Sequence, residues 1–399
     1  MGSAKALLAL TLQLALLGSL AAGVTAQQRY VVTNNNVNGA NSATVYLAGG
    51  TTLNPTLTKV ATIPTGGSGS PYGYFAANLV ALARAGANEC AFVSDGGSSD
   101  IAGINLASLT VTGQFKGSST DLASSGIGLV AHNGYLYAAF TGSQTLATFA
   151  IGSGCTLTFL GDVPSVGLGT SSMDQLAANG NMLVVVYSDT SVASFNLSGG
   201  IPVSNGDLQH TTGVTQYGNQ VGAVDITRDG HYALFGGFGG YTMVEVSDIS
   251  SGKITPTVVY GGPDQSLGTG AGSNTIWLGP EEEYIYITNT FSFQVTAVPF
   301  DPKTGTVLPF ASGGCIMNLK QLNKTASYPG SIVSAGPKEQ GGITLYVAED
   351  GASKPSSVSI LHRSTSNGQC TLTESADSPV WDGVTTDLPS IAAYPPRPF

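Results

Sequence analysis

The sequence predicts an all-β protein, a seven-bladed β-propeller closed by a C-terminal strand that completes the first blade. A recurring strand rhythm is the first observation. The stretch GYLYAAFTGSQTLATFAI (Gly134 to Ile151) repeats the pattern of EYIYITNTFSFQVTAVPF (Glu283 to Phe300) with almost no identical letters. Each stretch is typical of two antiparallel strands and a turn. The second observation is composition, since 54 glycines and only 10% charged residues suit a tightly turned β protein.

The rhythm occurs seven times along the chain. A second strand follows each strong strand after a short polar loop, and a third follows a Gly-containing turn. A smaller apolar run precedes every strong strand except the first. Four short strands in units of roughly 45 to 60 residues are the spacing of propeller blades. The seven strong strands are YVVTN (from Tyr30), CAFVSD (Cys90), YLYAAF (Tyr135), LVVVYS (Leu183), YALFGG (Tyr232), YIYITN (Tyr284) and TLYVAED (Thr344).

The third observation is that one inner strand is missing at the start of the chain and one extra strand occurs at its end. The first blade lacks its own inner run, while LPSIAAYPP (Leu388 to Pro396) is a surplus run of the same type. We therefore expect this last run to supply the missing strand and close the ring.

The N-terminus resembles a secretory signal peptide. Lys5 precedes an apolar stretch that ends in small residues, which predicts cleavage after Ala26. The alternative, a membrane anchor, needs a longer apolar span with cationic flanks. We expect residues 1–26 to be removed and residues 27–399 to form one propeller domain, secreted or lumenal in the secretory pathway and not in a membrane.

The four cysteines suggest two disulfides, because the chain is expected in an oxidising compartment. Cys155 and Cys370 follow the turn into the outer strand of the third and seventh blades, and Cys90 and Cys315 lie in the blades before them. We pair Cys90 with Cys155 and Cys315 with Cys370, although four cysteines permit three connectivities. Their spacing fits no zinc pattern, so no metal is expected.

Charge limits the partners. The net charge is −10 and only 14 residues are Lys or Arg, which argues against nucleic acid. Small molecules are therefore the expected partners, without a cofactor, and the oligomeric state stays open. Asn196 and Asn323 begin sequons for glycosylation.

The turns and strands resemble those of a known family. RDGHY, PEEEY and HNGYLY, the strands YLYAAF and YIYITN, and DPKTGTVL are similar to the seven-bladed lactonase family, which contains 6-phosphogluconolactonases and the fungal carboxymuconate lactonizing enzymes, or carboxymuconate cyclases. The resemblance implies an anionic substrate held by arginines and a histidine. The five arginines and four histidines do not occupy the expected channel positions, and we expect His132 and His231 to pack at turns.

The residues at the expected channel mouth are aromatic or neutral. They start the inner strands or lie in the loops beside them, where a ligand would meet the channel. Each has a plainer role available, in satisfying strand ends or packing between blades. The candidate substrate-binding residues are Tyr72, Tyr74, Asn219, Tyr187, Phe238, Tyr241, Phe291, Phe293, Tyr328, Ser331, Ser390 and Trp381.

Other motifs are assigned structural roles. GGFGG (Gly236 to Gly240) is read as a tight turn rather than a phosphate loop, because no helix follows it. The run Glu281 to Glu283 is read as a solvated turn. The loops Asn34 to Ala43 and Glu349 to Ser357 could be lids or turns. No G-x-S-x-G elbow is present.

Three functions remain open. The first is a cofactor-independent cyclase of fungal secondary metabolism, implied by the resemblance to propellers that include hetero-Diels–Alder cyclases. It would orient neutral aromatic or terpenoid substrates with hydrogen bonds from Asn274, Gln220 and Gln175 and with Asp174 as an acid or orienting group. The second is a lactonase in which Asp174 or Asp225 activates water. The third is a non-catalytic cell-wall glycoprotein or adhesin.

Overall fold

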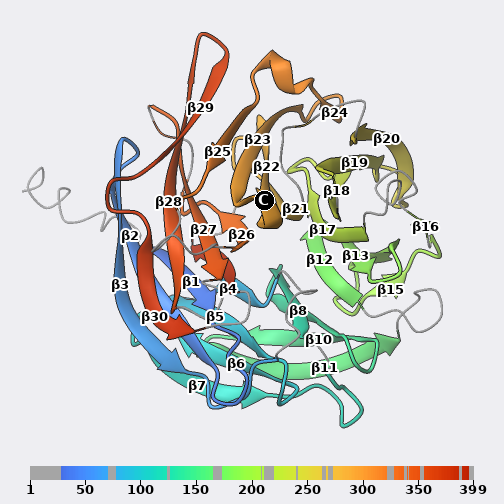
Figure 1. The fold of residues 1–399 in the computed structure, drawn as a ribbon. Coiled ribbons are helices and arrows are strands. Elements are labelled where there is room, and N and C mark those ends of the chain that lie inside the picture. The colour runs from blue at the N-terminus through green and yellow to red at the C-terminus, as the bar shows by residue number, and fades with distance from the viewer. Residues whose placement is uncertain are drawn as a thin grey trace, which may run out of the picture.

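A computed structural model of the chain shows seven antiparallel sheets arranged in a ring around a central axis, the line of the expected channel (Figure 1). It describes residues 28–70, 78–123, 126–164, 173–207, 209–210, 220–239, 241–262, 267, 273–320, 328–336, 339, 341–350, 355–385 and 389–394. The side chains of several strand residues, among them Asp174, Gln220, Phe238 and Asn274, are outside this description. The predicted all-β propeller is confirmed.

Each blade has its inner strand at the channel and its outer strands at the rim. Two short 3₁₀ helices, η3 (Thr290–Ser292) and η4 (Phe310–Ser312), lie in blade 6. From the channel outward, the strands are, in blade 1, β31 (Ser390–Tyr394), β1 (Arg29–Asn34), β2 (Ser42–Thr51) and β3 (Asn54–Pro64); in blade 2, β4 (Val80–Ala85), β5 (Asn88–Asp95), β6 (Asp100–Asn105) and β7 (Thr110–Phe115); in blade 3, β8 (Ile127–His132), β9 (Tyr135–Phe140), β10 (Thr145–Gly152) and β11 (Thr156–Pro164); in blade 4, β12 (Met173–Asn179), β13 (Met182–Tyr187), β14 (Ser191–Asn196), β15 (Val203–Ser204) and β16 (Gln209–His210); in blade 5, β17 (Gln220–Ile226), β18 (Tyr232–Phe238), β19 (Met243–Asp248) and β20 (Thr255–Gly261); in blade 6, β21 (Ser273–Leu278), β22 (Tyr284–Asn289), β23 (Gln294–Asp301), β24 (Thr306–Val307) and β25 (Cys315–Asn318); in blade 7, β26 (Tyr328–Val333), β27 (Ile343–Asp350), β28 (Pro355–Ser366), β29 (Gln369–Glu374) and β30 (Val380–Thr385).

The C-terminal strand closes the ring as expected. β31 pairs antiparallel with β1, in a register that runs from Tyr30 opposite Tyr394 to Asn34 opposite Ser390. The strand that ends the described chain is therefore the innermost strand of the blade that begins it.

The core is divided into seven apolar clusters, one between each pair of neighbouring blades. Between blades 2 and 3, for example, Phe92, Phe140 and Phe149 are fully buried. Both faces of every central strand are covered, which is why those strands read as continuous apolar runs and not as alternating ones.

Both predicted disulfides are present. Cys90 in β5 bonds to Cys155, just before β11, and Cys315 in β25 bonds to Cys370 in β29. Each bond joins neighbouring blades, and such bonds persist in oxidising compartments. No helix in the described ranges is long and apolar enough to span a bilayer.

The expectation of a solvated turn at Glu281 to Glu283 is wrong for two of its three residues. Glu281 forms an ion pair with Arg363, whose side chain is fully buried between blades 6 and 7. Glu282 is also buried and accepts the backbone N–H of Arg228. Only Glu283 is exposed.

Two other loop predictions are settled by packing. The GGFGG run is mostly strand, since Gly236 and Gly237 lie inside β18, and a Cβ on Gly236 would lie 2.5 Å from the side chain of Ile276 in the next blade. The loop from Asn34 to Ala43 is tied down and is not a lid, because the Asn34 amide donates to the backbone of Leu79 and Ser94 in blade 2. The loop from Glu349 to Ser357 lies partly outside the described residues.

Candidate functional site

The channel wall is built from the free edges of the inner strands, which pack side by side around the ring. A free edge leaves backbone N–H and C=O groups unpaired, and such groups need partners when they are buried. Polar side chains from the neighbouring inner strand supply them. Ser331 accepts the N–H of Ile391 at 2.9 Å, and Ser390 accepts that of Leu79 at 3.1 Å.

The same arrangement continues on the other side of the ring. Gln175 Oε1 accepts the N–H of Val224 at 3.2 Å, and Thr275 donates to the carbonyl of Gly330 at 3.0 Å. Three predicted ligand-binding or catalytic residues, Gln175, Ser331 and Ser390, therefore join successive blades. In these contacts they satisfy strand edges, which is the plainer role named above.

Inside this wall lies a cavity of about 170 Å³. Its lining is apolar apart from one amide and one carboxylate, and neither arginine nor histidine is among the described residues that line it. The lining residues are Asn78, Val130, Leu176, Ala177, Ala178, Val224, Asp225, Ile276 and Trp277.

Asn78 bridges three blades at this cavity. It precedes β4, its backbone carbonyl accepts the N–H of Leu129 in blade 3, and its Nδ2 donates to the carbonyl of Leu176 in blade 4. Among the described residues, its Oδ1 accepts no hydrogen bond. The amide thus keeps one N–H and one acceptor for a ligand.

Asp225 supplies the carboxylate. Its Oδ1 accepts the N–H of Ile226 and its Oδ2 that of Leu278 in the next blade, both at 2.8 Å. Both carboxylate oxygens are thus oriented by backbone N–H groups, and a carboxylate oxygen can accept more than one hydrogen bond.

Trp277 forms an aromatic part of the lining. Its ring lies 5.8 Å from that of Tyr286, centroid to centroid, with a tilt of 32°. Sequence reasoning missed Trp277 and Asn78 as channel residues. Trp277 lies within an apolar run, and a tryptophan in an inner strand was the signal that could have found it, because an indole is seldom fully buried.

Four successive inner strands are irregular near their first residues. β-Bulges lie in β12 at 173–175, β17 at 221–223, β21 at 273–276 and β26 at 329–332, whereas β31, β4 and β8 are regular. Bulges re-aim side chains and are frequent beside active sites. Asp174, Asn274 and Ser331, three of the predicted site residues, lie at these bulges.

The remaining predicted residues are not all at the channel. Tyr187 is fully buried in the core between blades 3 and 4, and Trp381 lies in β30, the outermost strand of blade 7. The prediction placed Trp381 at the mouth because the run around it was read as a loop, but it forms a strand. Tyr241 and Phe291 are 38% and 54% exposed.

Phe293 and Tyr328 lie together, with ring centroids 5.4 Å apart. Tyr72, Tyr74, Asn219 and Asn323 lie outside the described residues, and so do the side chains of Asp174, Gln220, Phe238 and Asn274. His132 Nε2 donates to the carbonyl oxygen of Gly180, 2.7 Å away, and His231 pairs with Asp229, so both pack at turns as expected.

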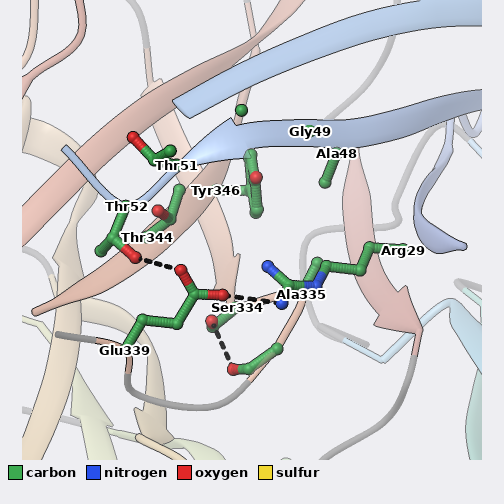
Figure 2. A pocket seen from close by; sticks show the side chains of 12 residues that line it. Arg29, Ala48, Gly49, Thr51, Thr52, Ser334, Ala335, Glu339, Thr344 and Tyr346 are labelled. Atoms are coloured by element: carbon green, nitrogen blue, oxygen red, sulfur yellow. Dashed lines mark hydrogen bonds and ion pairs between the residues drawn. The ribbon is translucent and has the colours of Figure 1, made fainter. Parts of the chain in front are cut away.

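A second hollow lies in the seam between blades 1 and 7 (Figure 2). Glu339 bridges Arg29 at 2.7 Å and Thr52 at 2.6 Å across it. These hydrogen bonds, Thr52 first and then Arg29, lower the pKa of Glu339. The enclosed space of about 10 Å³ holds no more than about one water. This hollow is a closure contact between the first and last blades.

No group of three or more His, Cys, Asp or Glu suited to a metal occurs among the residues with described positions.

No family model and no curated protein matches this chain. The structural relatives include a candidate 6-phosphogluconolactonase of Bacteroides fragilis, with a TM-score of 0.63, 15% identity, and coverage of 93% of this chain and 99% of that one.

Two further relatives have similar scores. A candidate 6-phosphogluconolactonase of Bacteroides uniformis gives a TM-score of 0.65 at 12% identity, covering 92% of this chain and 100% of its own. The periplasmic gluconolactonase of Pseudomonas aeruginosa gives 0.60 at 13%, covering 92% and 99%. Identities this low show a shared fold, and the chain is therefore a lactonase-like seven-bladed β-propeller in architecture.

Proposed function

We propose that this protein is an enzyme that hydrolyses one small uncharged lactone bound in the channel cavity. The observation that carries the proposal is the cavity itself, in which Asp225 is the one charged group among the described lining residues. A lining without cations offers nothing to a phosphate or a tricarboxylate, so a neutral substrate fits it best.

The size of the cavity favours one substrate over two. Its volume is about 170 Å³, close to the roughly 150 Å³ of an apolar cavity that binds benzene. One ring with short substituents matches this space. The joining of a polyketide to a terpene would need a second site, beyond the described lining.

The reaction needs a water, a base and a donor to the carbonyl. Asp225 would accept a proton from water as the water oxygen bonds to the lactone carbonyl carbon. The ring C–O bond then breaks, and the proton passes to the departing oxygen, which gives a hydroxy acid. The free N–H of Asn78 would donate to the carbonyl oxygen as negative charge develops on it.

A cyclase is the second candidate, and the face of Trp277 is the observation that favours it. A ring-closing reaction of one neutral molecule needs a shaped apolar wall and restricted orientation more than it needs a base. The three structural relatives described above carry lactonase names, but they resemble this chain in fold alone. Their support for the first candidate is therefore limited to the fold.

The two tryptophans of the chain allow a direct binding test. Trp277 lines the cavity and Trp381 lies on the outer rim. In the Trp381→Phe variant, we expect an uncharged lactone to change the remaining indole fluorescence in a saturable way. The matched Trp277→Phe variant should show no such change, and equal changes in both variants would exclude binding in this cavity.

Catalysis is tested separately, with a panel of uncharged lactones, 6-phosphogluconolactone, carboxymuconate and neutral diene–dienophile pairs. Asp225→Asn should reduce lactone hydrolysis by roughly 100-fold or more, the usual contribution of a general base, while the ligand still alters Trp277 fluorescence. Turnover of anionic substrates alone would contradict the proposal. Binding without turnover of any substrate would favour a non-catalytic binding protein.

We also propose that the chain is exported and that residues 1–26 are removed before the propeller, residues 27–399, functions as one domain. The two disulfides are compatible with this location. N-terminal sequencing of protein collected from the medium should begin at Gln27. Retention of the apolar N-terminus in a membrane fraction would contradict it.

A further inference from the structure

A wide groove lies between blades 4 and 5, away from the channel cavity. It has a volume of about 470 Å³ and is formed by the turn after β12, the end of β14, and the turns after β17 and β19. This volume is within the roughly 300–1,000 Å³ of pockets that hold drug-sized molecules. The cavity proposed above for catalysis shares none of these residues.

The groove has an apolar base and an amide-rich rim. Ile249 is buried and Met182 half-buried, whereas Asn181 and Lys253 are exposed. Within the described part of the chain, neither the Asn181 amide nor the Lys253 ammonium has a side-chain hydrogen bond or an ion pair. A base of this kind suits the apolar face of a sugar ring, and the rim suits its hydroxyl and acetamide groups.

Asn196 lies in the same lining and begins the sequon Asn196-Leu197-Ser198. It is exposed at the end of β14, and its Oδ1 accepts the N–H of Ser198 at 2.8 Å. Its Nδ2 makes no hydrogen bond to a described residue. The atom that receives a glycan in a sequon therefore opens into a groove with the chemistry of a sugar site.

We propose that an N-linked glycan on Asn196 occupies this groove and packs blade 4 against blade 5. The attachment forms a bond from Nδ2 to C1 of the first N-acetylglucosamine. It breaks the bond from C1 to a lipid-linked diphosphate, which leaves with the electron pair, and Nδ2 loses one proton. The first sugar ring then lies on Met182 and Ile249, within reach of Asn181 and Lys253.

The experiment uses the full chain secreted from a eukaryotic host. Mass spectrometry should find hexosamine on the peptide that contains Asn196 and none in the Ser198→Ala variant, which keeps Asn196 and removes only the sequon. An unmodified Asn196 in the secreted protein would overturn the proposal.

Hydrogen exchange tests whether the glycan occupies the groove. A peptide N-glycosidase removes the whole glycan, including the first sugar, and leaves an aspartate at position 196. After this treatment of the native protein, the turn at residues 249–253 should exchange about threefold faster or more, and the turn at Asn133 and Gly134 in blade 3 should not change. The double variant Asn181→Ala with Lys253→Ala should stay glycosylated but lose this protection. Occupancy without protection, or tight binding of an added oligosaccharide to the glycosylated protein, would overturn the groove assignment.

Discussion

At the scale of single residues, the sequence indicated several residues of the inner strands but not the contacts that their side chains make. Gln175, Ser331 and Ser390 lie in inner strands, and each accepts a backbone N–H of the next blade. Residue type cannot separate the two roles, because an amide or hydroxyl that caps a strand and one that binds a ligand have the same donors and acceptors. Only the position of the neighbouring strand decides between them.

Asp95 is a residue of this kind whose role has a measurable consequence. It is fully buried, and its Oδ1 accepts hydrogen bonds from Asn41 and Thr65, both at 2.8 Å. It pairs with Asp100 across the hairpin between β5 and β6. Burial, followed by the nearby Asp100, raises the pKa of Asp95 to about 7 against the hydrogen bonds that lower it.

We predict that Asp95 makes the protein less stable as the pH rises. An unfolded aspartate loses its proton near pH 4, whereas folded Asp95 keeps it to about pH 7. Between these values the folded state holds the extra proton, so the free energy of unfolding falls as pH increases. Asp95→Asn should remove roughly 1 kcal/mol per pH unit from that slope, as measured by urea unfolding from pH 4 to 8.

Asp248→Asn is the matched control, because hydrogen bonds from Ser250 lower the pKa of Asp248 and it releases its proton before this window. Its slope above pH 4 should equal that of the parent. Burial also raises the pKa of Asp382 to about 7, so some pH dependence should remain in Asp95→Asn. An unchanged slope in Asp95→Asn would show that Asp95 is ionised in the folded protein.

At the scale of elements, strands were more predictable than the contacts between blades. Each strong strand was identified because buried β-branched and aromatic residues recur with it. The turn at Glu281 to Glu283 was misread because its role depends on Arg363, 82 residues away. The bulges in β12, β17, β21 and β26 also left no sequence signal, since one extra residue on one strand changes neither composition nor rhythm.

We predict that the glutamates of this turn differ sharply in their contribution to stability. Arg363 donates to Glu281 and, at 2.9 Å, to the Tyr286 hydroxyl, and its guanidinium carbon lies 4.6 Å from the centre of the Tyr284 ring. Loss of one partner leaves an unpaired buried charge. Glu281→Gln should therefore reduce the free energy of unfolding by about 3 kcal/mol or more.

The exposed neighbour provides the control on the same turn. Glu283→Gln should change the free energy of unfolding by no more than about 0.5 kcal/mol, in the same denaturation assay at the same pH. Similar losses in both variants would mean that the turn acts through its net charge. The buried pair between blades 6 and 7 would then not be the cause.

At the scale of the whole molecule, the ring and its closure were predictable while the cavity was not. The first blade lacks an inner strand and the end of the chain has a surplus one. The surplus strand can fill the missing place, and β31 does so by pairing with β1. The cavity depends instead on which side chains meet where the inner edges of blades 2 to 6 converge. Asn78 precedes the inner strand of blade 2, and its side chain donates a hydrogen bond to blade 4. No local sequence pattern predicts a contact of this kind.

Closure gives the last prediction. A chain that stops before Ser390 lacks β31, so the inner edge of β1 is exposed and Leu79 loses the hydroxyl that accepts its N–H. We expect this truncation to lower the midpoint of thermal unfolding strongly, and to favour association of copies through the open edge. A peptide of residues 389–394 added in excess should restore much of the loss, since it can rebuild the strand by β-addition. A scrambled peptide of equal composition should not restore the midpoint.

The truncated chain could instead unfold at the same temperature as the parent. The ring would then be held by its interblade clusters and disulfides, and the strand pairing at its seam would be dispensable.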